Sequence, residues 1–220
     1  MTEKSWIFAI VAHSDDQILG PGATLAKYAK EGKNILTIIF SYGVFSNPHF
    51  KKEVIKDLRI EEAHKADKII GGQQVIFFDL KEGNFKQDFY EKNFNEELKK
   101  LLLKYKPEKI FTHADDDNLP DHKAVNKLVI ETYDELNKNK NFKTNIYTFG
   151  VWRFFKYKNR NKPRLVVDIS ETFDKKISAL KVFKSQWDSM LLLTWSVYVK
   201  AFLSGFKHNT SLSEEFQKIR

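Results

Sequence analysis

The sequence predicts an α/β fold: a three-layer, Rossmann-like, mostly parallel sheet with helices on both faces. Two observations support this prediction. Short apolar segments of strand length alternate along the chain with longer segments in which apolar residues recur at helical spacing. The short segments are apolar throughout, as expected for parallel strands that are buried on both faces. With 220 residues, 42% of them hydrophobic and 19 of them Phe, the chain can form one sizeable core.

Residues up to about 150 give the clearest elements. We expect strands at 6–12, 34–40, 74–79, 108–112 and 144–149, and helices at 21–31, 51–70, 90–105 and 121–138. The strand segments are rich in β-branched and other apolar residues. The first helix has Pro21 in its first turn and Gly32 just after its end, the second stops at Gly71–Gly72, and the third ends before Pro107.

The last part of the chain, about 150–220, is less regular. Arg164–Ile169 has the composition of a strand, and Thr172–Gln186 has apolar residues at helical spacing. No low-complexity linker separates this part from the rest, so we expect one domain over 1–220 with the irregular part packed on it. The apolar stretch Leu191–Phe206 could pack against another subunit, which would make the protein a homo-oligomer.

Composition excludes several classes of protein. The chain has no cysteine, which excludes disulfides, Cys-ligated zinc, iron–sulfur clusters and cysteine nucleophiles. Residues 6–12 are apolar but are followed at once by His13 and two aspartates, so they suit a buried strand better than a signal peptide. Met190–Leu203 is interrupted by polar residues, and we expect it to be too short and too polar to span a bilayer. We therefore expect a cytoplasmic protein without a transmembrane segment.

The formal net charge is +8 and comes almost entirely from lysine. Basic and acidic residues are mixed, which favours a solvated lysine-rich surface over a dedicated anion site. The densest basic patch, Arg153–Arg164, includes Phe154, Phe155 and Tyr157, but no nucleic-acid-binding motif surrounds it. We expect a surface loop there and no nucleic-acid partner.

Polar side chains gather where two of the predicted strands end. His13, Asp15 and Asp16 follow the first strand, and a second cluster that begins at His113 and includes His122 follows the fourth. Ligands of open α/β sheets bind beyond the carboxyl ends of the strands, so both clusters should lie at one edge of the sheet.

His13, Asp16 and His122 are candidate metal ligands. A catalytic zinc site takes three nitrogen or oxygen ligands and leaves one position for water. His13 and Asp16 are three residues apart on a turn, and His122 opens a helix from which it can complete the set. Asp15 would then remain free beside the water, where a carboxylate can act as general base.

The residue pattern by itself leaves other interpretations open. Asp15 and Asp16 suit the cap of the following helix. The aspartates after the fourth strand suit an acidic surface loop, although such a loop does not explain the two histidines. Two histidines and one carboxylate also form the facial triad of non-haem iron oxygenases, against which the α/β pattern argues. A nucleotide-binding Rossmann protein is disfavoured because Gly20 and Gly22 lack the G-x-G-x-x-G spacing, and they suit close packing at a helix start.

Several segments together resemble the LmbE-like, or PIG-L-like, N-deacetylases. Val11–Ala26, V-A-H-S-D-D-Q-I-L-G-P-G-A-T-L-A, resembles the family's A-H-P-D-D-E-x-L-G-x-G-G-T-L-A signature. Further matches follow in order: Arg59–Ala63, Thr112–His113 through Asp121–His122, Val167–Thr172, and then Lys176, Ala179–Leu180 and Lys184–Gln186. The resemblance runs from residue 6 to about 216 and implies the LmbE-like fold.

The resemblance implies a zinc-dependent N-deacetylase, an amidohydrolase that removes an N-acetyl group from an amino sugar or GlcNAc conjugate. His13, Asp16 and His122 would be the zinc ligands, with Fe²⁺ or another divalent metal as alternatives, and Asp15 the general base. Arg59 would reach the substrate, and Asp121 would orient a metal-bound histidine. The basic balance of the chain favours a small phosphorylated or nucleotide-linked sugar.

Three positions depart from the family pattern: Ser14 replaces the usual Pro, Gln17 the usual Glu, and Leu119 the first His of H-P-D-H. That His is thought to stabilise the oxyanion, which leucine cannot do. Asn118 could fill the neighbourhood and contact the substrate, and His113 is the other candidate for this catalytic role. The alternative is a non-catalytic, carbohydrate-binding or interaction member of the same fold.

Overall fold

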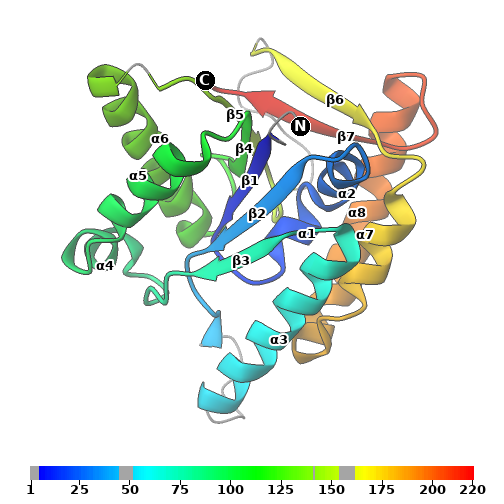
Figure 1. Ribbon diagram of the computed structural model, residues 1–220. Coiled ribbons are helices and arrows are strands. Elements are labelled where there is room, and N and C mark those ends of the chain that lie inside the picture. Colours follow the sequence, from blue (N-terminus) through cyan, green and yellow to red (C-terminus); the bar gives the residue numbers. More distant parts are fainter. Residues whose placement is uncertain (1–4, 45–51, 141, 154–161) are drawn as a thin grey trace.

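The computed structural model describes residues 5–44, 52–140, 142–153 and 162–220. Seven strands form one sheet in the order β3-β2-β1-β4-β5-β7-β6 (Figure 1). The five strands from β3 to β5 are parallel, and β7 is antiparallel to both of its neighbours. The strands are β1 (Trp6–Val11), β2 (Asn34–Ile39), β3 (Gln74–Phe77), β4 (Lys109–His113), β5 (Asn145–Phe149), β6 (Arg164–Asp168) and β7 (Ser213–Lys218).

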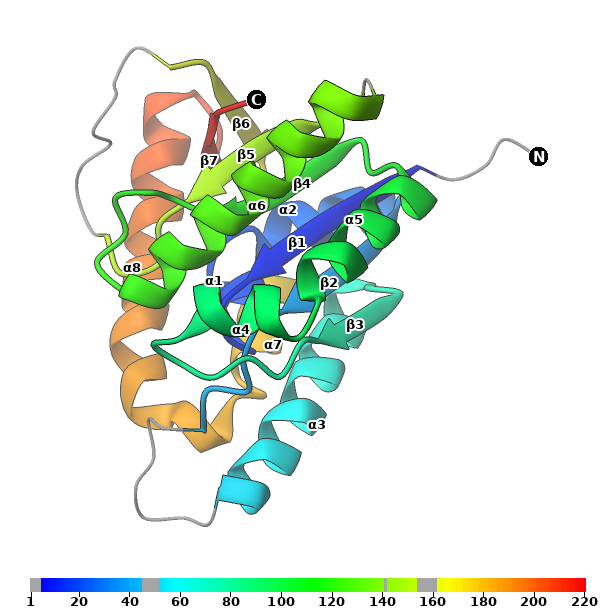
Figure 2. The ribbon, with the colours of Figure 1, turned by 90° about the vertical axis from the view of Figure 1, so that its left-hand side faces the viewer.

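Helices cover both faces of the sheet, and Figure 2 shows one of these layers in front of the strands. The helices are α1 (Asp16–Leu19), α2 (Gly22–Lys30), α3 (Lys52–Ile70), α4 (Phe85–Glu91), α5 (Phe94–Tyr105), α6 (Pro120–Lys140), α7 (Phe173–Leu180) and α8 (Trp187–Lys207), with a 3-10 turn, η2 (Lys184–Gln186). One apolar core lies under α1, α2, α3, α7 and α8, and the other under α4, α5 and α6. The predicted three-layer, mostly parallel α/β fold is confirmed.

The central strand β1 shows why the strand segments are apolar throughout. Ile7, Ala9 and Val11 face the first core, whereas Phe8 and Ile10 face the second. Each of these residues is fully buried. Helices on both faces remove both sets of side chains from water, so neither face needs polar residues.

The elements predicted up to residue 150 are all present, with shifted ends. The helix expected at 90–105 is two helices, α4 and α5, separated at Asn93, which adopts a positive φ of 59°. The helix expected at 21–31 is preceded by the short α1. The break at Asn93 falls inside a segment that the sequence analysis treated as one helix, whereas α1 lies outside every expected element.

The last part of the chain differs more from the prediction. Strand β6 agrees with the expected strand, but the helix expected over Thr172–Gln186 ends at Leu180. The sequence analysis assigned neither α8 nor β7. Strand β7 has the polar sequence S-E-E-F-Q-K and lies between β5 and β6. Its buried carboxylate at Glu214 is paired with Lys176, so a polar strand can occupy the inside of the sheet.

Helix α8 also corrects the expectation about Met190–Leu203. The segment Ser189–Lys207 is long enough and apolar enough to cross a membrane by length and composition, with mean hydropathy 1.3. In this fold Met190, Leu193 and Val197 belong to the first core, so one side of the helix packs on the sheet layer. The expected basic loop with Phe154, Phe155 and Tyr157 lies outside the described residues.

Candidate active site

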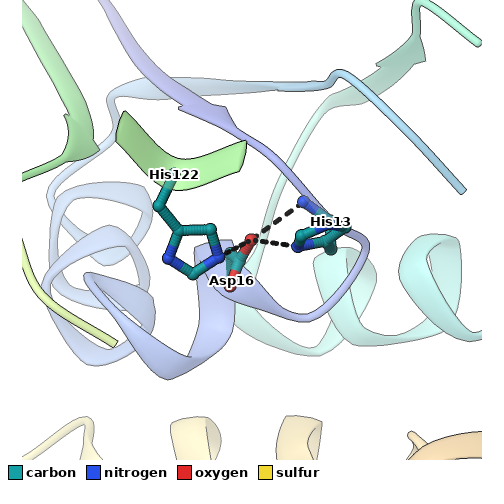
Figure 3. A group of neighbouring side chains, drawn as sticks. All are labelled: His13, Asp16 and His122. Carbon is teal, nitrogen blue, oxygen red and sulfur yellow. Dashed lines mark hydrogen bonds and ion pairs between the residues drawn. The ribbon is translucent and has the colours of Figure 1, made fainter. Parts of the chain in front are cut away.

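The two polar clusters meet at one edge of the sheet, as predicted. Strands β1 and β4 are neighbours in parallel register, and His13 follows β1 while His113 ends β4. His122 lies in the first turn of α6, which returns over the same edge. In Figure 3, His13 and Asp16 come from the turn after β1 and the start of α1, His122 comes from α6, and the three side chains point toward one another.

Asp16 stands at the centre of the group. Its Oδ2 accepts a hydrogen bond from the backbone N–H of His13 at 2.8 Å, which fixes the turn after β1. The same oxygen lies 3.4 Å from His13 Nδ1 and 3.4 Å from His122 Nε2. For bonds of about 2.1 Å, ligand atoms of a tetrahedral zinc ion stand roughly 3.4 Å apart. Ligand atoms of all three side chains lie within 4.8 Å of one another, so this group could hold a metal ion.

Each histidine of the group has a carboxylate beside its other ring nitrogen. His13 Nε2 lies 3.6 Å from Asp121 Oδ2, and His122 Nδ1 lies 3.1 Å from Asp117 Oδ1. In a neutral imidazole, a carboxylate beside one ring nitrogen keeps the proton on that nitrogen. The other ring nitrogen, which faces Asp16 here, can then bind a metal. Asp121 contacts His13, and Asp117 has an equivalent position beside His122 that the sequence analysis did not assign.

The electrostatics of the group favour a cation. Burial opposes the charged form of His13, but Asp121 and Asp16 outweigh it and raise the pKa of His13 to about 10. Burial likewise opposes charge on His122, yet Asp16 and Asp117 raise its pKa to about 9. His122 Nε2 is buried and makes no hydrogen bond within the described residues. Both rings therefore hold a proton near neutral pH in the metal-free protein, and a metal ion bound here would have to displace these protons.

Asp15 lies beside this group. Within the described residues, no hydrogen bond joins its side chain to the side chains of His13, Asp16 or His122. Its side chain is almost buried, with 6% exposed. Burial, and then the negative charge of Asp16, raise the pKa of Asp15 to about 6. A carboxylate with a pKa raised toward neutrality is suited to accepting and returning a proton near pH 7.

His113 is fully buried, below the ring of His122, with the two ring centroids 3.8 Å apart. Its Nε2 accepts the backbone N–H of Ala12 at 3.0 Å, and Asn126 Nδ2 donates to its carbonyl oxygen. Burial, followed by the charge of His122, lowers the pKa of His113 to about 4, so the ring is neutral. Because Nε2 of His113 already accepts the N–H of Ala12, its lone pair is in use in this geometry.

Two further predicted residues lie at the edge of the site. Arg59 on α3 is buried and donates to the carbonyl oxygens of Tyr42 and Gly43. Burial lowers the pKa of Arg59, and the charge of Asp15 opposes that effect. Asn118 is exposed, and its Nδ2 donates to the carbonyl oxygen of Trp152 at 2.7 Å.

Segments that share the family resemblance also contact one another. Glu62 on α3 accepts hydrogen bonds from both the N–H and the hydroxyl of Ser185, at 2.8 and 2.6 Å. Lys176 on α7 donates to the carbonyl oxygens of Leu19 and Gly20 as well as to Glu214. The loop after the turn that carries His13 and Asp16 is therefore held by a buried amine from the C-terminal part of the chain.

Asp117 is the residue that the sequence analysis missed. It was one of several aspartates after the fourth strand, and its spacing to His122 does not distinguish it from Asp115 or Asp116. Its full burial and its contact with His122 appear only when the loop is folded. No signal in the single sequence would have separated these three aspartates.

The fold and this group of side chains define a class of protein, and comparison with known families agrees with it. The family model described as GlcNAc-PI de-N-acetylase, PIG-L, matches residues 8–133, which is more than half of the chain. The chain belongs to this family. The match includes His13, Asp15, Asp16 and His122.

Two curated relatives are similar over most of the chain. A mycothiol S-conjugate amidase of Streptomyces coelicolor is 25% identical over 74% of this chain and 64% of its own length. The chain therefore spans less than two thirds of that relative. A probable N-acetyl-α-D-glucosaminyl L-malate deacetylase of Bacillus cereus is 24% identical over 84% of this chain and 85% of its own length.

Solved structures share the fold at low identity. The 4-carboxy-2-hydroxymuconate hydratase of Pseudomonas putida has a TM-score of 0.81 and 21% identity, covering 98% of this chain and 96% of that one. The N,N′-diacetylchitobiose deacetylase of Pyrococcus horikoshii has a TM-score of 0.79 and 18% identity, covering 99% and 84%. Because a hydratase and a deacetylase share this architecture, the fold alone does not choose the reaction.

Proposed function

We propose that this protein is a zinc-dependent N-deacetylase that hydrolyses the N-acetyl group of GlcNAc or of another amino-sugar conjugate. The observation that carries the proposal is the convergence of His13, Asp16 and His122 with the almost buried Asp15 beside them. The names of the two curated relatives support an amide bond in a sugar conjugate as the target. Fe²⁺ or another divalent ion would suit the same donor atoms.

His13 Nδ1, Asp16 Oδ2 and His122 Nε2 would hold the metal. A bound zinc ion supplies acidity to water and an electrophilic partner for the amide oxygen. Asp117 and Asp121 would orient the two imidazoles through their outer nitrogens. Metal binding then requires both histidines to lose the protons that the surrounding carboxylates stabilise.

Asp15 would act as general base and then as general acid. It accepts a proton from the attacking water as the bond between water oxygen and acetyl carbon forms. It returns that proton to the amide nitrogen when the carbon–nitrogen bond breaks, which releases acetate and the free amine. A pKa of about 6 suits both transfers near neutral pH.

The remaining predicted residues receive more limited roles. His113, whose Nε2 already accepts the Ala12 N–H, would position the ring of His122 and stays a candidate for catalysis only if that bond opens. Arg59 and Asn118 would line the substrate side of the site. Leu119 offers no side-chain donor for the oxyanion, and this favours the second candidate, a sugar-binding member of the family without hydrolytic activity.

An acetate-release assay over a panel of GlcNAc conjugates, with zinc added, tests the proposal. We expect turnover by the native protein and its loss, by at least about 100-fold, in Asp15→Asn. Zinc content measured on the same preparation should be unchanged, since Asp15 is not a ligand. Asp115→Asn, an exposed aspartate after β4, is the matched control and should remain active.

The outcomes separate the two candidates. Stoichiometric zinc with no acetate release from any conjugate, together with binding of a GlcNAc conjugate, would favour the non-catalytic sugar-binding member. Full activity in Asp15→Asn would refute the role of the general base. Absence of zinc or iron binding by the native protein would refute the metal site itself.

A further inference from the structure

Helix α8 presents a broad apolar face to solvent. Twelve large hydrophobic side chains are exposed among the described residues, and nine of them belong to this helix. Their exposed fractions run from 38% at Val199 to 80% at Phe206. The nine are Trp187, Leu191, Leu192, Trp195, Tyr198, Val199, Phe202, Leu203 and Phe206.

The area of this face, here called the α8 face, exceeds that of ordinary surface patches. An aromatic side chain carries about 150–250 Å², so the exposed parts of its five aromatic residues amount to roughly 650 Å². The four aliphatic residues bring the total to roughly 1,000 Å². The largest apolar patch on a typical monomer is about 300–600 Å², whereas a standard protein interface buries about 800 Å² on each partner. The α8 face is therefore large enough for a stable dimer.

The spacing along α8 fits a second helix. One exposed row has separations of three, four, three and four residues, namely Leu192, Trp195, Val199, Phe202 and Phe206. A row of this period runs straight along one side of a helix and packs against another helix. Beside it, a groove of about 710 Å³ between α7 and α8 is lined by Ile177, Leu180, Phe183 and Trp195 among others, and it can receive side chains from a facing helix.

The area and the helical spacing of the α8 face suit a second copy of this chain, and charge does not oppose one there. Both lysines of α8 turn away from the face: Lys200 Nζ donates to the carbonyl oxygens of Gly150 and Val151, and Lys207 Nζ lies 3.3 Å from Glu215. Two copies that each carry a net charge of +8 can approach closely only at a neutral surface. The exposed row is such a surface and can meet its own copy across a two-fold axis.

We propose that two copies of this protein associate through the α8 face, with the two α8 helices packed against each other. This inference is independent of the proposed function. It requires no contribution from the metal site.

Sedimentation of the full chain over a range of concentrations tests the proposal. We expect a reversible species of twice the 25.8 kDa chain mass. The double variant Trp195→Glu/Phe202→Glu should weaken association by at least about 100-fold, because it would bury unpaired charges at the interface centre. Val54→Glu, a change at an equally apolar exposed site on α3, is the matched control and should still associate.

Two measurements guard against a variant that merely misfolds. The native protein's melting temperature should rise with protein concentration, as it does when association stabilises the folded chain. A cysteine introduced as Val199→Cys, at the middle of the face, should form a disulfide between copies, whereas Val54→Cys should not. The chain has no other cysteine to confuse this readout.

The proposal is overturned if the native protein is monomeric at all concentrations, or if the double variant associates as the native protein does. Vesicles of phosphatidylcholine with phosphatidylserine provide the remaining arm. A native protein that stays monomeric and binds these vesicles through the same face, with loss of binding in the double variant, would assign the α8 face to a lipid surface instead.

Discussion

The contacts of Asp117 allow one substitution to be worked out in detail, Asp117→Asn. Oδ1 of Asp117 accepts the N–H of Leu119 at 3.2 Å and faces His122 Nδ1 at 3.1 Å. Oδ2 accepts the N–H of Val151 at 2.8 Å and that of Trp152 at 3.3 Å. All four partners are donors when His122 binds metal through Nε2. An amide has only one acceptor oxygen, so in either orientation it points its NH₂ group at other donors.

Two effects of Asp117→Asn follow from this geometry. Loss of an outer carboxylate from a metal-bound histidine weakens metal affinity about 10–100-fold, or about 1.4–2.7 kcal/mol. Leaving buried donors unpaired costs a further ~1–3 kcal/mol of folding free energy. For a chain of this length each kcal/mol lowers the melting temperature by about 2–4 °C.

Competition with a zinc chelator measures the affinity, and thermal melting of the metal-free protein measures the folding effect separately. Asp115→Asn removes the same charge from an exposed position two residues earlier, and we expect it to change neither quantity. Native-like zinc affinity and melting temperature in Asp117→Asn would refute the role that the structure gives this carboxylate.

Three further predictions concern buried groups elsewhere. Burial raises the pKa of Asp67 to about 7, and its hydrogen bond with Thr37 opposes this effect. The contribution of Asp67 to the free energy of unfolding is therefore fully present below about pH 4 and is lost as the pH rises through 7. Asp67→Asn should therefore gain stability over the native protein between pH 5 and 8 in urea unfolding, by at most about 4 kcal/mol, and no gain would contradict the shift. Gly20→Ala places a methyl group on the ring of Phe149 and should lower stability by about 1–3 kcal/mol in thermal melting, and an unchanged melting temperature would contradict this contact. Lys176→Met leaves Glu214 buried without its cation and should lower the free energy of unfolding by about 3–5 kcal/mol in chemical unfolding. Adding Glu214→Gln to this variant should recover part of that loss. Equal losses in the single and the double variant would disprove the coupling between the two residues.

Much of the parallel sheet and the metal group could be predicted because their signals are local. Strand β1 is apolar on both faces, and His13 and Asp16 lie three residues apart directly after it. The placement of His122 beside them followed from the rule that parallel strands end at one edge. The structure has the mostly parallel sheet and brings these side chains together, and their binding of a metal stays a prediction.

The parts that escaped prediction depend on contacts between distant residues. Strand β7 is polar, and partners distant in the chain, among them Lys176 for Glu214 and Arg164 for Glu215, allow it to lie inside the sheet. Asp117 acquires its place from backbone groups at Val151 and Trp152, more than thirty residues away. Neither arrangement leaves a local pattern in the sequence from which it could be predicted.

The position of β7 in the sheet has a consequence for the order in which the chain can assemble. Strand β6 joins the sheet through β7 alone, yet β6, α7 and α8 all precede β7 in the chain. During synthesis, more than forty residues must therefore leave the ribosome before β6 finds its neighbour. Lys176, which also donates to the carbonyl oxygens of Leu19 and Gly20, gains its ion pair with Glu214 only when β7 has been made. The segment that follows His13 and Asp16 therefore gains its contacts with Glu214 only after residue 214 has been made, although His13 and Asp16 are among the first residues to emerge.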